Sequence, residues 1–353
     1  MVTDTRQRAW EDSYRALRGL MKANPSISVG RDALSFGDAE AKQAFYGHLD
    51  DLTSALVDEY LAPVPGLLRT SAQQRFDEVE ASLKATAGIV GVELSRTLDD
   101  YRHDARSTAA RLLFGAAIRL LQGRMDAKGL VAFVKKEVPA HLAETDRYLY
   151  EAWVAYGLIE LLGPVGFHAV QRVAEGAFEA RPTDRIVLGA QAASRDYRLP
   201  EALFVTTSGS CFAYKFEHST EIVSYTQPCR ARDFTSGGNT ARQVCHRVLL
   251  LYKVDDPAVV PVIAQRSKKS MRAPDLMVEH LSSLEYASLD KRQEVRSRSE
   301  LADCPRPTQV VLREARPDVS LGPKETGLRA FATHVVGHDR TALAAVLEPL
   351  QAS

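Results

Sequence analysis

The spacing of apolar residues changes near position 176, and this change constrains the fold more than any other feature of the sequence. Before it, apolar side chains recur every three or four residues, as they do over 10–21, which is typical of amphipathic helices. After it, they form short runs rich in β-branched and aromatic residues, such as Ala202–Thr207, which favour strands. The pattern therefore predicts an α+β protein: an all-α helical bundle over 1–176, followed by a mixed α/β domain built on a twisted sheet over 177–353.

The first half is expected to contain six or seven helices. A helical spacing over Phe45–Tyr60 stops before Pro63, because proline cannot continue a helix without its amide hydrogen. A second apolar stripe over Phe76–Tyr101 predicts one long helix. Further helices are expected over 107–122, 127–137, 141–162 and 164–175.

The second half is expected to hold the sheet. The run Val248–Leu251 is apolar on both faces, which favours a central strand that is covered on both sides. Residues 275–301 predict one or two helices, and Thr341–Leu350 predicts a closing helix. The other strands are expected over Arg185–Gly189, Ala202–Thr207, Cys211–Glu217, Glu221–Thr226, Val259–Ala264, Gln309–Leu312 and Ala330–Val336.

Composition excludes several classes of protein. The chain has 353 residues, with 45 basic and 45 acidic side chains, 45% hydrophobic residues and 25% charged residues. This is the balance of a soluble globular protein and excludes a disordered polyelectrolyte, a collagen-like chain and a disulfide-dense mini-protein. The zero net charge removes global electrostatics as a guide to partners.

The compartment is predicted from the cysteines and the apolar segments. The four cysteines form no C-x-x-C pair, and residues 1–12 contain no apolar stretch like that of a secretory signal. The most apolar window, 153–170, is interrupted by Gly163 and Pro164, so no membrane helix is expected. We expect a cytoplasmic protein with reduced thiols, and the excess of arginine over lysine points to a GC-rich bacterial or phage genome.

The densest group of cations is the segment 266–272, which contains no acidic residue. Its serine hydroxyls and cationic side chains suit phosphate oxygens, as hydrogen-bond donors and as point charges. The segment follows a predicted strand, so it is a candidate contact for nucleic acid or a nucleotide, although a solvated loop has the same composition. The predicted phosphate-binding residues are Arg266, Lys268, Lys269 and Arg272.

A second candidate site lies on the predicted hairpin. Lys215 and Glu217 are two residues apart and so project from the same face of a strand, and Glu201 lies at the start of the preceding strand. An acid on one strand and an acid with a lysine on the next loosely resemble the site of metal-dependent nucleases of the PD-(D/E)XK type, over about 20 residues. The resemblance implies that the acids would hold Mg²⁺ and that the lysine would orient water. The order here is Lys-x-Glu, with Ala213 in place of the family's acid, and an ordinary ion pair on an exposed hairpin face explains the same residues.

Two further groups of residues are candidates for metal sites. His334 and His338 flank a predicted strand end, and an extended chain would hold them about 13 Å apart, too far to share zinc. Asp100 and Asp104 fit a polar helix face with compensating arginines. No P-loop, dinucleotide-binding, zincin or serine-hydrolase motif is present in the sequence. We therefore predict no resident metal and no cofactor, apart from Mg²⁺ if the protein is a nuclease.

These observations favour an assembly or interaction protein. The helical half would bind a second copy or another protein, and the α/β half would contact a phosphate-bearing ligand or nucleic acid. Apolar residues cover more than one face of the helix predicted over 107–122, which is typical of a core helix or a subunit interface. The alternative is a metal-dependent phosphodiesterase that uses Glu201, Lys215 and Glu217. The sequence leaves open whether there is catalysis.

Overall fold

The chain is an α+β protein. The computed structural model describes residues 9–31, 33–174, 177–187, 199–216, 249–261, 272–302, 304–315 and 331–351. Its contacts form two compact units. The helical unit consists of Met1–Gln73 and Arg96–Arg147, and the sheet unit consists of Gln74–Ser95 and Tyr148–Ser353. These units do not coincide with the two halves that differ in apolar spacing, because residues 74–95 and 148–176 belong with the sheet.

The helical unit is built around two antiparallel helices and their partners. Trp10 on α1 donates its indole N–H to the Tyr60 hydroxyl on α2 at 3.2 Å, which pairs the start of the first helix with the end of the second. Asp38 accepts the Ala41 amide at 2.6 Å and caps α2. The elements of this unit are α1 (Ala9–Ala23), β1 (Ile27–Val29), β2 (Leu34–Phe36), α2 (Ala39–Tyr60), α4 (Arg96–His103), α5 (Ala105–Leu121) and the first part of α6 (Ala127–Leu161).

The unit's core confirms most of the expected helical stripes. Phe45, Leu49, Leu52 and Leu56 of α2 are fully buried. On α5, however, the apolar residues are not all core: Leu113, Leu120 and Leu121 are buried, whereas Leu112, Phe114 and Ile118 are half-buried.

Four of the expected helices differ in the structure. The long helix over 76–101 is interrupted, because α3 (Ser71–Ala87) ends before Gly88, whose φ of 64° is left-handed, and the chain then forms β3 (Gly91–Glu93). The helices over 127–137 and 141–162 are one continuous α6 that contains Pro139, with Val138 and Leu142 buried on either side of it. Residues 164–175 are not helical: they form β4 (Pro164–Ala174) after Gly163, whose φ is 66°.

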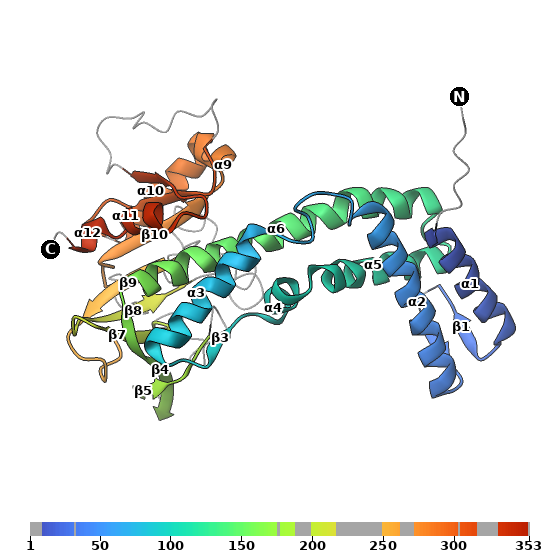
Figure 1. Cartoon of the computed structure of the whole chain (residues 1–353), viewed down its shortest axis with the longest axis horizontal. Helices are drawn as coiled ribbons and strands as arrows, with labels where there is room; N and C mark the ends of the chain where they lie inside the picture. The colour runs from blue at the N-terminus through green and yellow to red at the C-terminus, as the bar shows by residue number, and fades with distance from the viewer. Residues whose placement is uncertain are drawn as a thin grey trace, which may run out of the picture. The chain divides into compact units, whose positions relative to one another are not determined.

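The sheet unit contains an eight-stranded mixed sheet in the order β12-β11-β10-β9-β8-β7-β4-β5 (Figure 1). Neighbours from β5 to β10 are antiparallel, and β10, β11 and β12 are parallel. As expected, Leu249–Leu251 lie on a central, buried strand. The other strands are β5 (Ala177–Thr183), β7 (Ala202–Thr206), β8 (Cys211–Lys215), β9 (Leu249–Val254), β10 (Leu276–Leu281), β11 (Gln309–Leu312) and β12 (Ala332–Val335), and β6 (Arg185–Val187) pairs separately with β3.

The parallel end of the sheet corrects a further prediction. Residues 276–281, expected to be helical, are the fully buried strand β10. Ser282 then caps α9 (Ser283–Ala287) in a capping box with Glu285, and α10 (Leu289–Ala302) completes the connection to β11. The closing helix is present as α11 (Arg340–Ala345) and α12 (Glu348–Gln351). The predictions over 221–226 and 262–264 lie outside the described residues, and 259–261 are not a strand.

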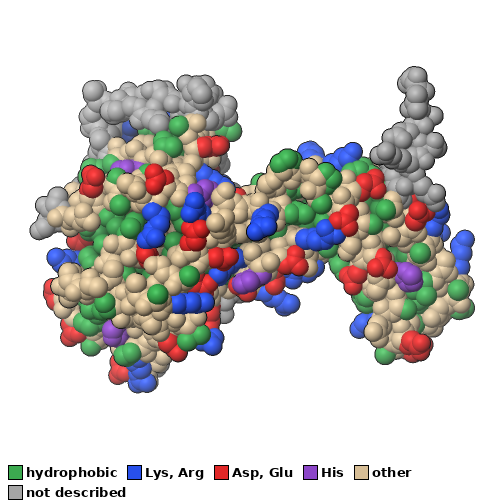
Figure 2. Space-filling view, viewed as in Figure 1, with side chains coloured by type: hydrophobic (Ala, Val, Ile, Leu, Met, Phe, Trp, Pro, Cys, Tyr) green, Lys and Arg blue, Asp and Glu red, His purple; other side chains and the backbone are tan. Residues whose placement is uncertain are grey.

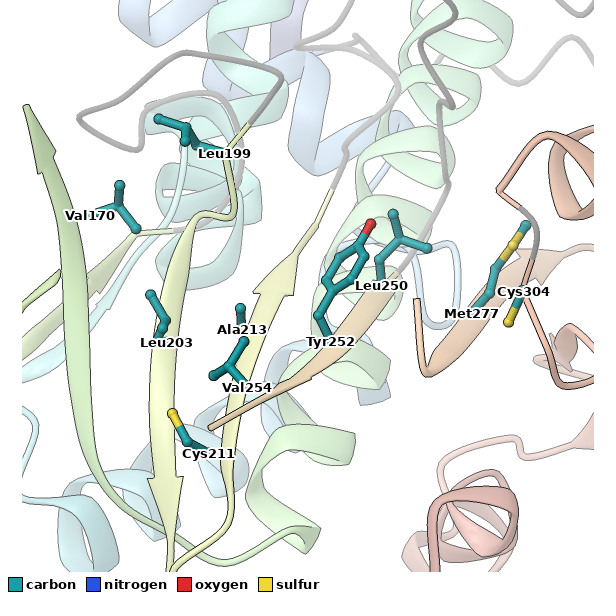
Figure 3. Packing of buried hydrophobic residues seen from close by; sticks show 10 residues of the cluster. All are labelled: Val170, Leu199, Leu203, Cys211, Ala213, Leu250, Tyr252, Val254, Met277 and Cys304. Carbon is teal, nitrogen blue, oxygen red and sulfur yellow. The ribbon is translucent and has the colours of Figure 1, made fainter. Parts of the chain in front are cut away.

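Both faces of the sheet are covered, which explains why its strands are so apolar. On one face, Tyr156 of α6 packs edge-on against Phe76 of α3 and against Tyr214 of β8, with ring centroids 6.3 Å apart in both pairs. Figure 1 shows α3 and the second half of α6 on this face. The opposite face holds the core cluster in Figure 3, which includes Leu203, Ala213 and Tyr252.

The cap of α5 gives a test of the helical unit. The Asp104 carboxylate accepts the Ser107 hydroxyl at 2.7 Å and its amide at 2.9 Å, and these bonds lower the pKa of Asp104. We expect Asp104→Ala to lower the free energy of unfolding by about 1 kcal/mol at pH 7. Because the pKa is depressed in the folded state, this difference should disappear as pH falls through that lowered pKa. Urea unfolding of Asp104→Ala at several pH values measures this, with the exposed Asp50→Ala as the control; equal losses in both variants contradict the assignment.

Candidate functional site

In the described part of the sheet unit, a group of cations lies near the end of β9 and just before β10. Lys253 is exposed near the end of β9, and its backbone amide donates to Asp275 Oδ2 at 2.7 Å. Arg272 is also exposed, and its Nη2 donates to the Lys253 carbonyl at 2.7 Å. These bonds hold Arg272 against the strand that carries Lys253. We call Lys253, Arg272, Asp275 and Arg306 the basic corner.

Arg306 links the basic corner to the end of the chain. Its Nη1 donates to the Asp275 carbonyl at 2.9 Å and lies 3.7 Å from Asp275 Oδ1, and its Nε donates to the Pro349 carbonyl at 2.9 Å. Arg306 and Asp275 are 22% and 32% exposed, so this pair is more shielded from solvent than Lys253 and Arg272. Arg272 therefore contacts the backbone of Lys253 and Arg306 contacts Asp275, while Asp255 and Asp256, which follow Lys253, are also exposed, so this surface carries charges of both signs.

The basic corner includes one of the four phosphate-binding residues predicted from the sequence. Arg272 belongs to it, while Arg266, Lys268 and Lys269 lie outside the described residues. Sequence reasoning missed Lys253 and Arg306, because hydrogen bonds between distant segments join Lys253 to Arg272 and Arg306 to Asp275. A lone lysine in the otherwise apolar strand Leu249–Val254 was the available signal.

The predicted nuclease residues lie at the β7–β8 hairpin. The register pairs Ala202 with Tyr214, and the Glu201 amide donates to the Tyr214 carbonyl at 2.8 Å, so the next position along brings Glu201 beside Lys215. The Lys215 Nζ donates to the Leu199 carbonyl at 3.2 Å. Glu217 lies outside the described residues.

The face of the hairpin that carries Lys215 is not an exposed surface. Cys211 and Ala213 project from the same face as Lys215 and are buried in the core cluster of Figure 3. On the other face the Tyr156 and Tyr214 hydroxyls are 3.4 Å apart, and burial, with Glu201 nearby, raises the pKa of both tyrosines. A lysine in this setting is half-buried and anchored to the backbone.

The other thiols and histidines considered from the sequence have structural partners. Cys211 is buried, and burial raises the pKa of its thiol to about 11, which makes it a poor nucleophile at neutral pH. Cys304 is buried with its Sγ 3.4 Å from the Pro274 carbonyl, and Cys229 and Cys245 lie outside the described residues. His334 Nε2 lies 2.8 Å from Gln309 Oε1. Within the described ranges, no three His, Cys, Asp or Glu side chains are grouped to hold a metal ion.

Asp100 and Asp104 have the ordinary roles expected of them. Asp100 accepts Arg111 Nη1 at 2.7 Å, and Asp104 caps α5 rather than lying within α4. Neither carboxylate is left for a shared cation.

Sequence reasoning missed a buried pair of a histidine and a glutamate. His280 Nδ1 on β10 lies 3.2 Å from Glu151 Oε1 on α6, and the two side chains are 3% and 0% exposed. The rings of Tyr150 and His280 are 5.0 Å apart, and Arg313 lies 5.2 Å above the Tyr150 ring. No local pattern predicts this cluster, because 129 residues separate the two partners. It joins α6 to the middle of the sheet.

Comparisons with protein-family models, with curated proteins and with solved structures found no match to this chain. Among the helices that the structure describes, none is long and apolar enough to cross a membrane.

The buried pair of Glu151 and His280 leads to a prediction about the stability of the protein. We expect His280→Leu to lower the free energy of unfolding by about 3 kcal/mol, because the Glu151 carboxylate stays buried after its partner is removed. The double variant Glu151→Leu/His280→Leu should lose less than the sum of the two single variants, since no buried charge then remains. Denaturant unfolding of all three variants measures this coupling, and the exposed His141→Leu is the control. Strict additivity means that the pair is not coupled.

Proposed function

We propose that this is a cytoplasmic assembly protein of bacterial or phage origin that binds nucleic acid through its sheet unit and a protein partner through its helical unit. The observation that carries the nucleic-acid part is the basic corner, in which the exposed Arg272 side chain donates to the backbone carbonyl of exposed Lys253. Lysine and arginine side chains that contact phosphates supply most of sequence-independent nucleic-acid binding.

The chemistry of the two cations supports a phosphate ligand. The Arg272 guanidinium has five N–H donors in a planar fork, and one donor group binds the Lys253 carbonyl, so further donors remain for phosphate oxygens. The Lys253 ammonium adds a point charge with three donors. The basic segment 266–272 is continuous in sequence with Arg272 and adds three cations to the same stretch of chain. Such a surface would bind the charged phosphate backbone without recognising the base sequence.

A salt titration tests nucleic-acid binding. We expect a fluorescent oligonucleotide of about 20 nucleotides, single-stranded or duplex, to bind at low salt. Its affinity should fall steeply between roughly 50 and 200 mM salt, as is usual for phosphate contacts. Lys253→Ala/Arg272→Ala should weaken binding about tenfold or more and lower the slope of log K against log salt by roughly two on duplex DNA, at every sequence tried.

The matched control is Arg96→Ala/Lys136→Ala, which removes two cations that are 91% and 86% exposed. It should leave the affinity and the slope near wild type. Equal effects of the two double variants would mean diffuse attraction without a site, and absence of binding at low salt would end the nucleic-acid proposal. Full competition by a mononucleotide would instead identify a small nucleotide as the ligand.

A second candidate function is metal-dependent phosphodiester cleavage at Glu201 and Lys215. The observation that favours it is the β7–β8 register, which brings an acid and a lysine together on adjacent strands. The anchored Lys215 ammonium would orient water or a phosphate oxygen, and Glu201 with Glu217 would supply oxygen ligands for Mg²⁺.

Cleavage assays with Mg²⁺ decide between binding and catalysis. If the protein is a nuclease, Lys215→Met should reduce the cleavage rate at least about 100-fold while nucleic-acid affinity is retained, because lysine acts on the reaction rather than on docking. Lys136→Met, at an exposed position, is the control. Wild-type protein that does not cut DNA or RNA, or a Lys215→Met variant that cuts normally, excludes this function.

A further inference from the structure

Asp275 connects the cations of the basic corner to one another. Its Oδ2 accepts the Lys253 backbone amide at 2.7 Å, and its own amide donates to the Leu251 carbonyl at 2.8 Å. Its carbonyl accepts Arg306 Nη1 at 2.9 Å. Both the side chain and the backbone of Asp275 are therefore engaged, by β9 on one side and by the segment before β11 on the other.

The Asp275 carboxylate holds the residue to whose backbone Arg272 is bound. Lys253 is held at its amide by Asp275 and at its carbonyl by Arg272 Nη2, with both hydrogen bonds 2.7 Å long. Lys253 and Arg272 are exposed, whereas the Asp275 side chain is only 32% exposed. A half-buried acceptor thus determines where two exposed cations are attached to the sheet.

Charge alone does not explain a carboxylate at this place. Asp275 has the same sign of charge as a phosphate group, so by its charge it weakens the attraction of the neighbouring cations for phosphate. Figure 2 shows basic and acidic side chains interspersed over the visible face of the sheet unit. Phosphate binding at the basic corner therefore depends on how its cations are placed rather than on an excess of positive charge.

We infer that Asp275 is a positioning residue for the phosphate site, whose carboxylate oxygen holds Lys253 and Arg272 in place before the ligand binds. Groups that are ordered in advance lose less conformational freedom on binding, which raises the affinity. The inference rests on the proposed function and deepens it, because it names the group that organises the phosphate site. Asp275 acts through the two cations and does not itself bind phosphate.

Two substitutions of Asp275 in the full chain separate positioning from electrostatics, because both remove the same negative charge. Asp275→Asn keeps an oxygen that can accept the Lys253 amide, and Asp275→Ala does not. We expect Asp275→Ala to weaken binding of the fluorescent oligonucleotide about threefold or more and to lower the slope of log K against log salt. Asp275→Asn should bind at least as tightly as wild type, since it keeps the hydrogen bond and removes the repulsion.

Asp255→Ala is the matched control, because Asp255 is an exposed carboxylate that follows Lys253 closely in the sequence. It should bind the oligonucleotide at least as tightly as wild type, and circular dichroism and urea midpoints check that all three variants are folded. If Asp275→Ala binds as tightly as wild type or more tightly, the carboxylate acts only through its charge. If Asp275→Asn is weakened as much as Asp275→Ala, the hydrogen bond is not what matters. Either result overturns the inference.

Amide hydrogen exchange separates this inference from the proposed function. The Lys253 amide should exchange faster in Asp275→Ala than in wild type or Asp275→Asn, with or without nucleic acid, because its acceptor is gone. Unchanged exchange in Asp275→Ala contradicts the inference, whatever happens to binding. Failure of wild-type protein to bind the oligonucleotide ends the proposed function instead, and the exchange rates still decide whether Asp275 positions the basic corner.

Discussion

The sheet unit depends on the burial of one stretch of α6. Every residue from Tyr148 to Ile159 is buried, so this part of the helix has no solvent face and must be surrounded by other elements. Strands β8 and β10 contact this stretch of α6 through Tyr214 and His280, and α3 contacts it through Phe76. Helix α11 contacts it through Leu343, which lies so close to Gly157 that a Cβ atom at position 157 would be 2.7 Å from Leu343 Cδ2. The residues that hold α6 in place therefore also set the distance between the sheet and the helices packed on it.

Local periodicity predicted the class of fold and many of its elements. The α2 and α5 stripes, the β7–β8 hairpin and the central position of Leu249–Leu251 all follow from spacing that a single segment carries. The failures have physical reasons. Strand β10 contains a Glu-His pair that looks like a polar helix face, and those polar residues are tolerated in a buried strand because His280 finds Glu151 on α6. Strand β4 follows a long apolar helix without a marked change in composition, and only Leu162 and Gly163 separate them.

The candidate site was less predictable than the fold, because it is assembled by strand pairing. Arg272 was identified from its neighbours in sequence, but Lys253 and Arg306 join it only through hydrogen bonds that cross between segments.

The sheet unit is discontinuous along the chain, since α3 belongs to it while the residues that follow, 96–147, belong to the other unit. During synthesis the apolar face of α3 emerges from the ribosome long before the part of α6 that packs against it. Between Phe76 and its neighbour Tyr156, a ribosome needs on the order of ten seconds. For that interval Phe76, Val79 and Leu83 form an exposed apolar surface on the nascent chain. Protection of this surface by a chaperone or by transient collapse of the chain is then part of how this protein folds.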